Sequence, residues 1–217
     1  MIKKIFRIFI LLIITSPLTH ANEELILNSD KAFSPTFLNR FSFLAGVNPS
    51  IRKASDITNF SFSYGKKIDD YWFDSNILVT NALFSKITTN NTNATELGND
   101  QISSTKSNLI SVGAGYGRES HYIQSLLPFT DLYEMMAANL TYNIYNETAS
   151  EKTFSGLGML AKFSLYKKVS DYMSLGTQFS YNLSALKRAS DSESETSSNR
   201  SLTLSYLTIG FELNFYL

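Results

Sequence analysis

Apolar and polar residues alternate with a period of two over the last seventeen residues, Ser201–Leu217. This alternation is typical of a strand with one apolar and one polar face, because successive side chains point to opposite sides. Toward the C-terminus the apolar positions are odd-numbered, whereas Leu202, Leu204 and Tyr206 are even-numbered. The phase therefore shifts between Tyr206 and Leu207, and we expect a β-bulge or a crossing of the barrel rim there.

Seven further segments alternate in the same way and predict strands. Their expected positions are about 40–48, Phe60–Tyr64, Tyr71 to about Phe84, about 107–117, about 134–146, Gly158–Leu165 and Met173–Ser184. In each segment we expect the apolar face to point outward. In the third segment that face consists of Phe73, Ile77, Val79 and Leu83, opposite Asp74, Asn76 and Thr80.

Short and long connections alternate along the chain. The long ones, rich in Ser, Thr and Asn, are 86–106, 147–153 and 187–200, and they are expected to be surface loops. The short ones, 66–71 and 167–172, are near-repeats that begin with Lys-Lys. This alternation predicts strands that run up and down, with both chain ends on the same side.

An antiparallel sheet leaves no unpaired edge only if it closes on itself. We therefore predict an all-β fold: an eight-stranded antiparallel up-and-down transmembrane β-barrel formed by residues 40–217. A membrane strand tilted by about 45° needs about 9–11 residues, which most of the segments supply. The connection Arg118–Tyr133 is longer than the other turns at its end of the barrel and could form a short packed turn or helix.

A soluble, lipocalin-like barrel with the apolar face inward around a ligand would alternate identically. Its polar face would meet water and should be dense in Lys and Glu. Here that face consists mostly of Ser, Gly, Asn, Thr and Gln, and the charges lie in turns and loops. Small uncharged groups suit a confined interior, which favours the transmembrane barrel over the soluble one.

Residues 1–21 have the organisation of a secretory signal peptide. Three basic residues precede the apolar stretch Ile8–Ile14, and Thr19–Ala21 supplies a small-residue cleavage site. The apolar stretch is too short for a bilayer that demands about 20 helical residues. We expect cleavage after Ala21, followed by an irregular N-terminal segment, 22–39.

Composition narrows the function further. Without the signal peptide, basic residues fall from 19 to 16 against 19 acidic ones, a net charge of −3, which offers no electrostatic basis for binding nucleic acid. The chain has no cysteine, which excludes disulfides and thiolate metal sites. His121 would be the only histidine of the mature chain, in the connection opposite the long loops. We predict no catalytic residue, no cofactor and no metal site.

Across residues 40–217 the chain resembles the small eight-stranded outer-membrane barrel proteins of the OmpA/OmpX class. The most specific piece is Gly210–Phe215, which is similar to that family's assembly signal, Gly-x-x-apolar-x-aromatic, with Gly210, Leu213 and Phe215 at its defined positions. The chain continues past the aromatic residue with Tyr216-Leu217. The resemblance implies a location in the bacterial outer membrane, contact with outer-membrane lipid, and recognition by the barrel-assembly machinery during insertion.

Three charged residues, Asp74, Lys162 and Glu212, are expected inside the barrel at a similar height near its periplasmic mouth. An unpaired ion in a narrow interior costs several kcal/mol, so these charges should pair. Two interpretations follow: a structural salt bridge in a closed core, or a gate across a narrow pore for small solutes. Because eight strands usually enclose only enough space for their own side chains, we favour a non-enzymatic barrel with a structural or surface-interaction role. The loops 86–106 and 187–200 would then contact an extracellular ligand or surface.

Overall fold

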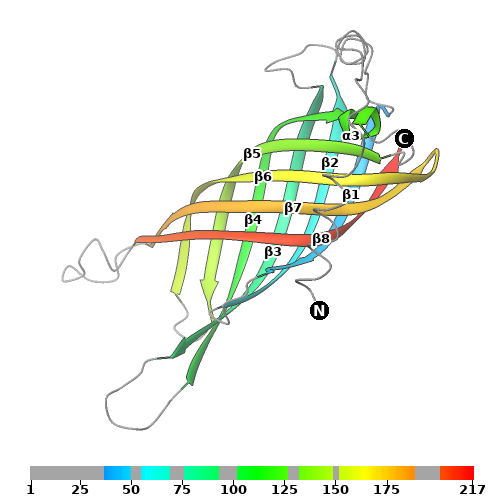
Figure 1. Ribbon diagram of the computed structural model, residues 1–217. Coiled ribbons are helices and arrows are strands. Elements are labelled where there is room, and N and C mark those ends of the chain that lie inside the picture. Colours follow the sequence, from blue (N-terminus) through cyan, green and yellow to red (C-terminus); the bar gives the residue numbers. More distant parts are fainter. Residues whose placement is uncertain are drawn as a thin grey trace. The chain divides into compact units, whose positions relative to one another are not determined.

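The computed structural model describes residues 37–49, 55–68, 76–92, 102–126, 132–148, 152–188 and 201–217, all within the compact unit Ser34–Leu217. In these ranges eight antiparallel strands form a closed barrel, in which each strand pairs with its sequence neighbours and β1 pairs with β8 (Figure 1). The strands are β1 (Asn39–Val47), β2 (Ser55–Lys67), β3 (Ile77–Thr92), β4 (Ile102–Ser120), β5 (Leu132–Glu147), β6 (Lys152–Ser170), β7 (Met173–Lys187) and β8 (Ser201–Tyr216), with helix α3 (Tyr122–Leu126) after β4. The predicted eight-stranded up-and-down barrel is confirmed. The predicted signal peptide and most of segment 22–39 lie outside the described residues.

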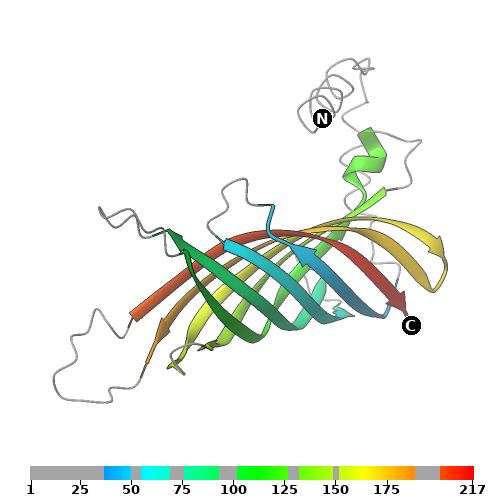
Figure 2. The ribbon, with the colours of Figure 1, turned by 90° about the horizontal axis from the view of Figure 1, so that it is seen from below.

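The pairing register fixes the tilt of the strands. A row of paired residues that starts at Arg40 and crosses β2 to β7 arrives on β8 at Tyr206. Across the β1–β8 seam, however, Arg40 pairs directly with Tyr216. The sheet therefore closes with a stagger of ten residues (216 minus 206), which for eight strands corresponds to a tilt of about 40°. Figure 2 shows that the strands run obliquely. Each row of paired residues climbs away from the C-terminal end as it passes from β1 to β8.

Large apolar side chains cover the outside of the barrel, as predicted. Examples are Phe43, Phe60, Val112, Leu140, Leu157, Met159, Phe179, Phe211 and Phe215, all of which are exposed. The opposite positions of the same strands are mostly buried Ser, Asn, Thr and Gln. Because the apolar residues face outward and the small polar ones face inward, the soluble lipocalin-like alternative is wrong.

Outward-facing charges of the strands gather in two rims. The rim at the end that carries α3 contains Lys66, Arg118, Lys167 and the buried carboxylate Glu134. The opposite rim contains Asp56, Lys86, Lys106 and Lys187. Between the two rims, no outward-facing strand residue in the described ranges is charged. A continuous apolar band bounded by charged residues is the surface that fits a bilayer.

The predicted faces of β3 are wrong. Ile77, Val79 and Leu83 are buried in the barrel, whereas Leu78 and Phe84 are exposed on the outside. Both faces of this strand are apolar, so alternation alone could not tell them apart. The strand also begins later and ends later than predicted, and residues 71–75, which include Phe73 and Asp74, lie outside the described ranges.

The predicted bulge in β8 is also wrong. The pairing of β7 with β8 runs without irregularity along the whole strand. Tyr206 is buried in the interior, and Leu202 and Leu204, which share its face, are half-buried. The phase shift therefore marks a section of the barrel where the interior itself is apolar. The ladder of β6 and β7 has its irregularity between Lys168 and Ser170, next to a short turn.

The predicted loop 86–106 is largely strand. Pairing of β3 with β4 continues to Thr92 and Ile102, whereas the ladder with β2 ends at Thr89 and the ladder with β5 ends at Ser107. The end of this hairpin therefore projects beyond the barrel wall as a two-stranded ribbon, dark green in Figure 1. Threonine favours strands, and backbone pairing needs no apolar face, so a polar sequence can continue the ladder.

Helix α3 occupies the long connection after β4, where a packed turn or helix was predicted. The Glu134 carboxylate accepts hydrogen bonds from Ser120 Oγ (2.9 Å) and from the backbone N–H groups of Tyr122 and Ile123, so it caps the first turn of the helix. Ser120 and Glu134 pair across β4 and β5 and have the parity of outward positions. The helix therefore begins on the outer side of the wall. No helix in the described part of the chain is both long and apolar enough to cross a membrane.

A charge placed in the middle of the apolar band tests the assignment of inside and outside. Leu140 is 66% exposed on the outer face of β5, and Leu140→Lys should lower the free energy of unfolding in phospholipid vesicles by about 2–4 kcal/mol. The matched control is Thr203→Lys at the charged rim opposite α3, which should have a much smaller effect. Denaturant titration of both variants checks this, and equal stabilities would contradict a lipid-facing band.

Candidate functional site in the barrel interior

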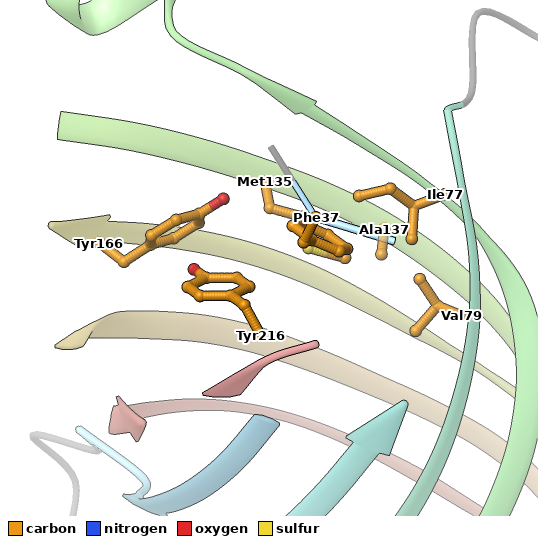
Figure 3. Packing of buried hydrophobic residues seen from close by; sticks show 7 residues of the cluster. All are labelled: Phe37, Ile77, Val79, Met135, Ala137, Tyr166 and Tyr216. Carbon is orange, nitrogen blue, oxygen red and sulfur yellow. The ribbon is translucent and has the colours of Figure 1, made fainter. Parts of the chain in front are cut away.

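The interior consists of two apolar clusters separated by a polar section. The proximal cluster, at the C-terminal end, contains Phe37, Ile77, Val79, Met135, Ala137, Tyr166 and Tyr216 (Figure 3). The distal cluster, toward the projecting hairpin, contains Ile57, Ile87, Leu109, Tyr145, Phe154, Leu186 and Tyr206. Both clusters draw residues from strands on opposite sides of the wall. Each therefore fills the cross-section of the barrel at its own level.

Arg40 lies in the polar section against the proximal cluster. Its Nη2 donates to Glu212 Oε1 at 2.9 Å, and its Nε donates to Asn214 Oδ1 at 3.0 Å. Its Cζ lies 4.6 Å from the centroid of the Tyr166 ring. Arg40 is 1% exposed and Glu212 is 2% exposed, so both charges have been removed from water. A buried ion pair of this kind is tolerated only when further hydrogen bonds support it, as they do here.

Lys162 and Glu212, two of the three predicted interior charges, line the same small cavity. Lys162 Nζ donates to Ser63 Oγ at 2.6 Å, and both charged side chains border the cavity together with Gln178. Its volume of about 10 Å³ is enough for a single water molecule. Glu212 Oε2 and Gln178 Nε2 have no protein hydrogen-bond partner. The third predicted charge, Asp74, lies outside the described residues.

Arg40, which the sequence interpretation did not include, is the residue that pairs with Glu212. A usable signal was present, because Arg40 shares the even-numbered phase of Ser42 on the first strand and should point inward with it. Position 40 is the first residue of the predicted strand, where alternation does not yet assign a side chain to a face.

Hydrogen bonds between side chains of different strands connect part of the polar section. Asn59 Nδ2 donates to Thr208 Oγ1 at 2.9 Å, and Thr208 is also 2.6 Å from Ser180 Oγ. Nearer the C-terminus, Ser174 Oγ is 2.6 Å from Tyr216 Oη and accepts from Asn214 Nδ2 at 3.0 Å. These bonds connect β2, β7 and β8 through the interior. The buried side-chain amides of Asn81 and Asn139, on β3 and β5, have no hydrogen-bond partner, so the network covers only part of the polar section.

The three residues of the predicted assembly signal lie at the β1–β8 seam. Gly210 faces the interior beside Gly46, and a Cβ atom on it would come within 2.5 Å of the Ala45 carbonyl oxygen. Close packing therefore accounts for this glycine. Leu213 and Phe215 face outward, and the Phe215 ring lies 6.2 Å from that of Phe43 on β1. The outward placement of both side chains leaves them accessible from the lipid side.

Comparison with known proteins supports the architecture. No family model matches the chain, and no curated protein matches it. Among solved structures, Neisserial surface protein A (NspA) matches with a TM-score of 0.52 and 11% identity, over 84% of this chain and 97% of NspA. The chain shares the fold of NspA. The attachment invasion locus protein Ail of Yersinia pestis is also similar, with 7% identity and a TM-score of 0.26, over 80% of this chain and 95% of Ail. At the level of fold, the NspA match confirms the predicted resemblance to small eight-stranded outer-membrane barrels.

Removal of one partner of the Arg40–Glu212 pair should destabilise the barrel strongly. Arg40→Met removes the guanidinium that binds the Glu212 carboxylate and leaves Lys162 as the remaining cation on the cavity that Glu212 borders, and we expect a loss of about 3–5 kcal/mol in the free energy of unfolding. The double variant Arg40→Met/Glu212→Met should recover part of that loss, because neither charge of the pair remains buried, while Lys162 stays in the interior. Lys66→Met, which removes an exposed charge, serves as the control. Unfolding in detergent micelles measures all of them, and a stable Arg40→Met single variant would show that the pair contributes little.

Proposed function

We propose that the protein is a non-enzymatic β-barrel of the bacterial outer membrane that acts at the cell surface through the parts of the chain beyond its distal rim. The observation that carries the proposal is the uncharged apolar band between two charged rims, around a polar interior. This arrangement is stable only when hydrocarbon surrounds the barrel and its backbone groups are paired within the wall. We therefore expect outer-membrane lipid to contact the apolar band.

The turn between β6 and β7 and the projecting β3–β4 ribbon give the orientation. Outer-membrane barrels keep short turns on the periplasmic side and longer loops outside. Strands β6 and β7 are joined by a two-residue turn, Asp171-Tyr172, at the end that also holds the C-terminus. That end should face the periplasm. The β3–β4 ribbon and the connection 189–200 would then reach the cell surface, where they would contact an extracellular ligand or surface.

The interior argues against a narrow pore. A conducting barrel needs a continuous water-filled path, whereas two apolar clusters fill the cross-section at two levels here. The Arg40–Glu212 pair and the one-water cavity lie between them. A structural salt bridge in a closed core therefore fits better than a gate, and a surface role fits better than transport.

The proposal includes export of the chain and assembly of the barrel in the outer membrane. Residues 1–21 would direct the chain out of the cytoplasm and be removed. The barrel-assembly machinery would then recognise the last strand through Gly210, Leu213 and Phe215, of which the latter two are accessible from the lipid side.

Cysteine labelling tests the location and the orientation together. The chain has no cysteine, so single variants give an unambiguous signal. Thr95→Cys, between β3 and β4, should react on intact cells with a maleimide coupled to a polymer too large to cross the outer membrane. Asp171→Cys, in the short turn, should react only after the outer membrane is permeabilised. The opposite pattern would invert the orientation, and labelling of the soluble fraction alone would refute the membrane location.

Conductance in planar bilayers separates the surface role from the pore. The purified, heat-modifiable protein should produce no discrete conductance steps above the detergent background, because the interior is packed. A porin reconstituted in parallel serves as the positive control. Reproducible steps that change in Lys162→Ala would instead support a pore gated by the interior charges.

A further inference from the structure

A groove crosses the outside of the barrel between the two rims. Its volume is about 600 Å³, and it extends from β4 to β8. Two rows of the pairing register define it. One row passes from Arg118 through Met136, Phe163 and Phe179, and the next passes from Tyr116 through Ala138, Ala161 and Tyr181 to Leu207. The two alanines form the floor between larger side chains, so the groove is an open, mostly apolar depression.

The periplasmic end of the groove carries a cation. Arg118 is half-buried on the outer face of β4 and lines the groove, and its guanidinium lies 5.9 Å from the centroid of the Tyr122 ring. Tyr122 and Leu126 are exposed on α3, and Leu126 is 70% exposed. Tyrosine and arginine at the edge of an apolar surface are typical of the membrane interface, where lipid headgroups lie.

The tilt of the sheet gives the groove a direction. Because the register rows climb as they pass from β4 to β8, the groove rises from Arg118 by roughly 3 Å per strand, away from the periplasmic end. It therefore starts at the level of the headgroups and runs into the hydrocarbon region. In a phospholipid, the acyl chain likewise runs from the phosphate at the headgroup level into the hydrocarbon region.

We propose that this groove binds one phospholipid of the periplasmic leaflet, with an acyl chain over Ala138 and Ala161 and the phosphate on the Arg118 guanidinium. The inference rests on the proposed membrane location. Arginine matches the geometry of phosphate oxygens, and the aromatic ring beside it restricts its position. A second apolar groove lies on the outer surface over β1 to β3 and is lined by residues such as Phe43, Phe60 and Phe211. No charged residue lines it, so it offers no charge to bind a lipid headgroup.

Native mass spectrometry of protein extracted from outer membranes in a mild detergent tests the proposal. The wild type should retain one phospholipid at collision energies that strip detergent. Arg118→Gln should reduce the lipid-bound fraction about fivefold, the effect expected for one cationic side chain at a membrane surface. Ala138→Phe, which fills the floor but keeps the cation, should reduce it as well. Lys66→Gln removes a cation of the same rim outside the groove and should retain the wild-type fraction.

Added phosphatidylglycerol and phosphatidylethanolamine distinguish recognition of net charge from recognition of the phosphate. Preference for the anionic lipid, or equal retention of both, supports the site, provided that Arg118→Gln retains less lipid than the Lys66→Gln control. The proposal is overturned if the wild type retains no lipid, if Lys66→Gln loses as much as Arg118→Gln, or if Arg118→Gln and Ala138→Phe both retain it fully. Heat-modifiable migration of every variant reports the fold independently. Normal migration in the outer-membrane fraction without bound lipid would refute this site and leave the proposed function intact.

Discussion

Backbone pairing within the wall is the constraint on which the rest of the structure depends. In hydrocarbon, an N–H or C=O group without a partner costs several kcal/mol, so the sheet has to close on itself. Closure of eight strands with a stagger of ten residues sets the tilt and leaves an interior that is narrow enough for side chains to fill. Which side chains face inward, and at what height they meet, follows from that geometry. The apolar clusters, the polar network and the groove on the outer surface are all consequences of it.

The strands were predictable wherever one face was apolar and the other was not. Segments such as β5 and β7 carry apolar residues at most of their outward positions, and the sequence predicts those faces correctly. Alternation does not identify the outward face where both faces of a strand are apolar. In β3 the inward residues Ile77 and Val79 belong to the proximal cluster, and in β8 Tyr206 belongs to the distal cluster. Alternation reports a contrast between faces, and that contrast disappears where the interior is itself apolar.

The interior charges were predictable one strand at a time but not as a pair. Lys162 and Glu212 stood out because each is a lone charge on an inward face, and the structure places both beside one cavity. The partner of Glu212 depends on the register across the β1–β8 seam, where Arg40 and Glu212 lie on strands at opposite ends of the sequence. A stagger of ten residues cannot be obtained from periodicity within any single strand. The position of Arg118 at the lower end of a rising groove depends on the same stagger.

The wall is not equally strong around its circumference. Strand β1 has nine residues, and the seam with β8 contains eight residue pairs, whereas β3 and β4 share sixteen. The seam is therefore the line along which the cylinder has the fewest backbone bonds to break. Arg40 reaches across it from β1 to Glu212 and Asn214 on β8. The buried ion pair connects the two strands of the shortest ladder. Unfolding should therefore begin with separation of the first strand from the last. The free energy of the ion pair should then contribute to the barrier that sets the unfolding rate.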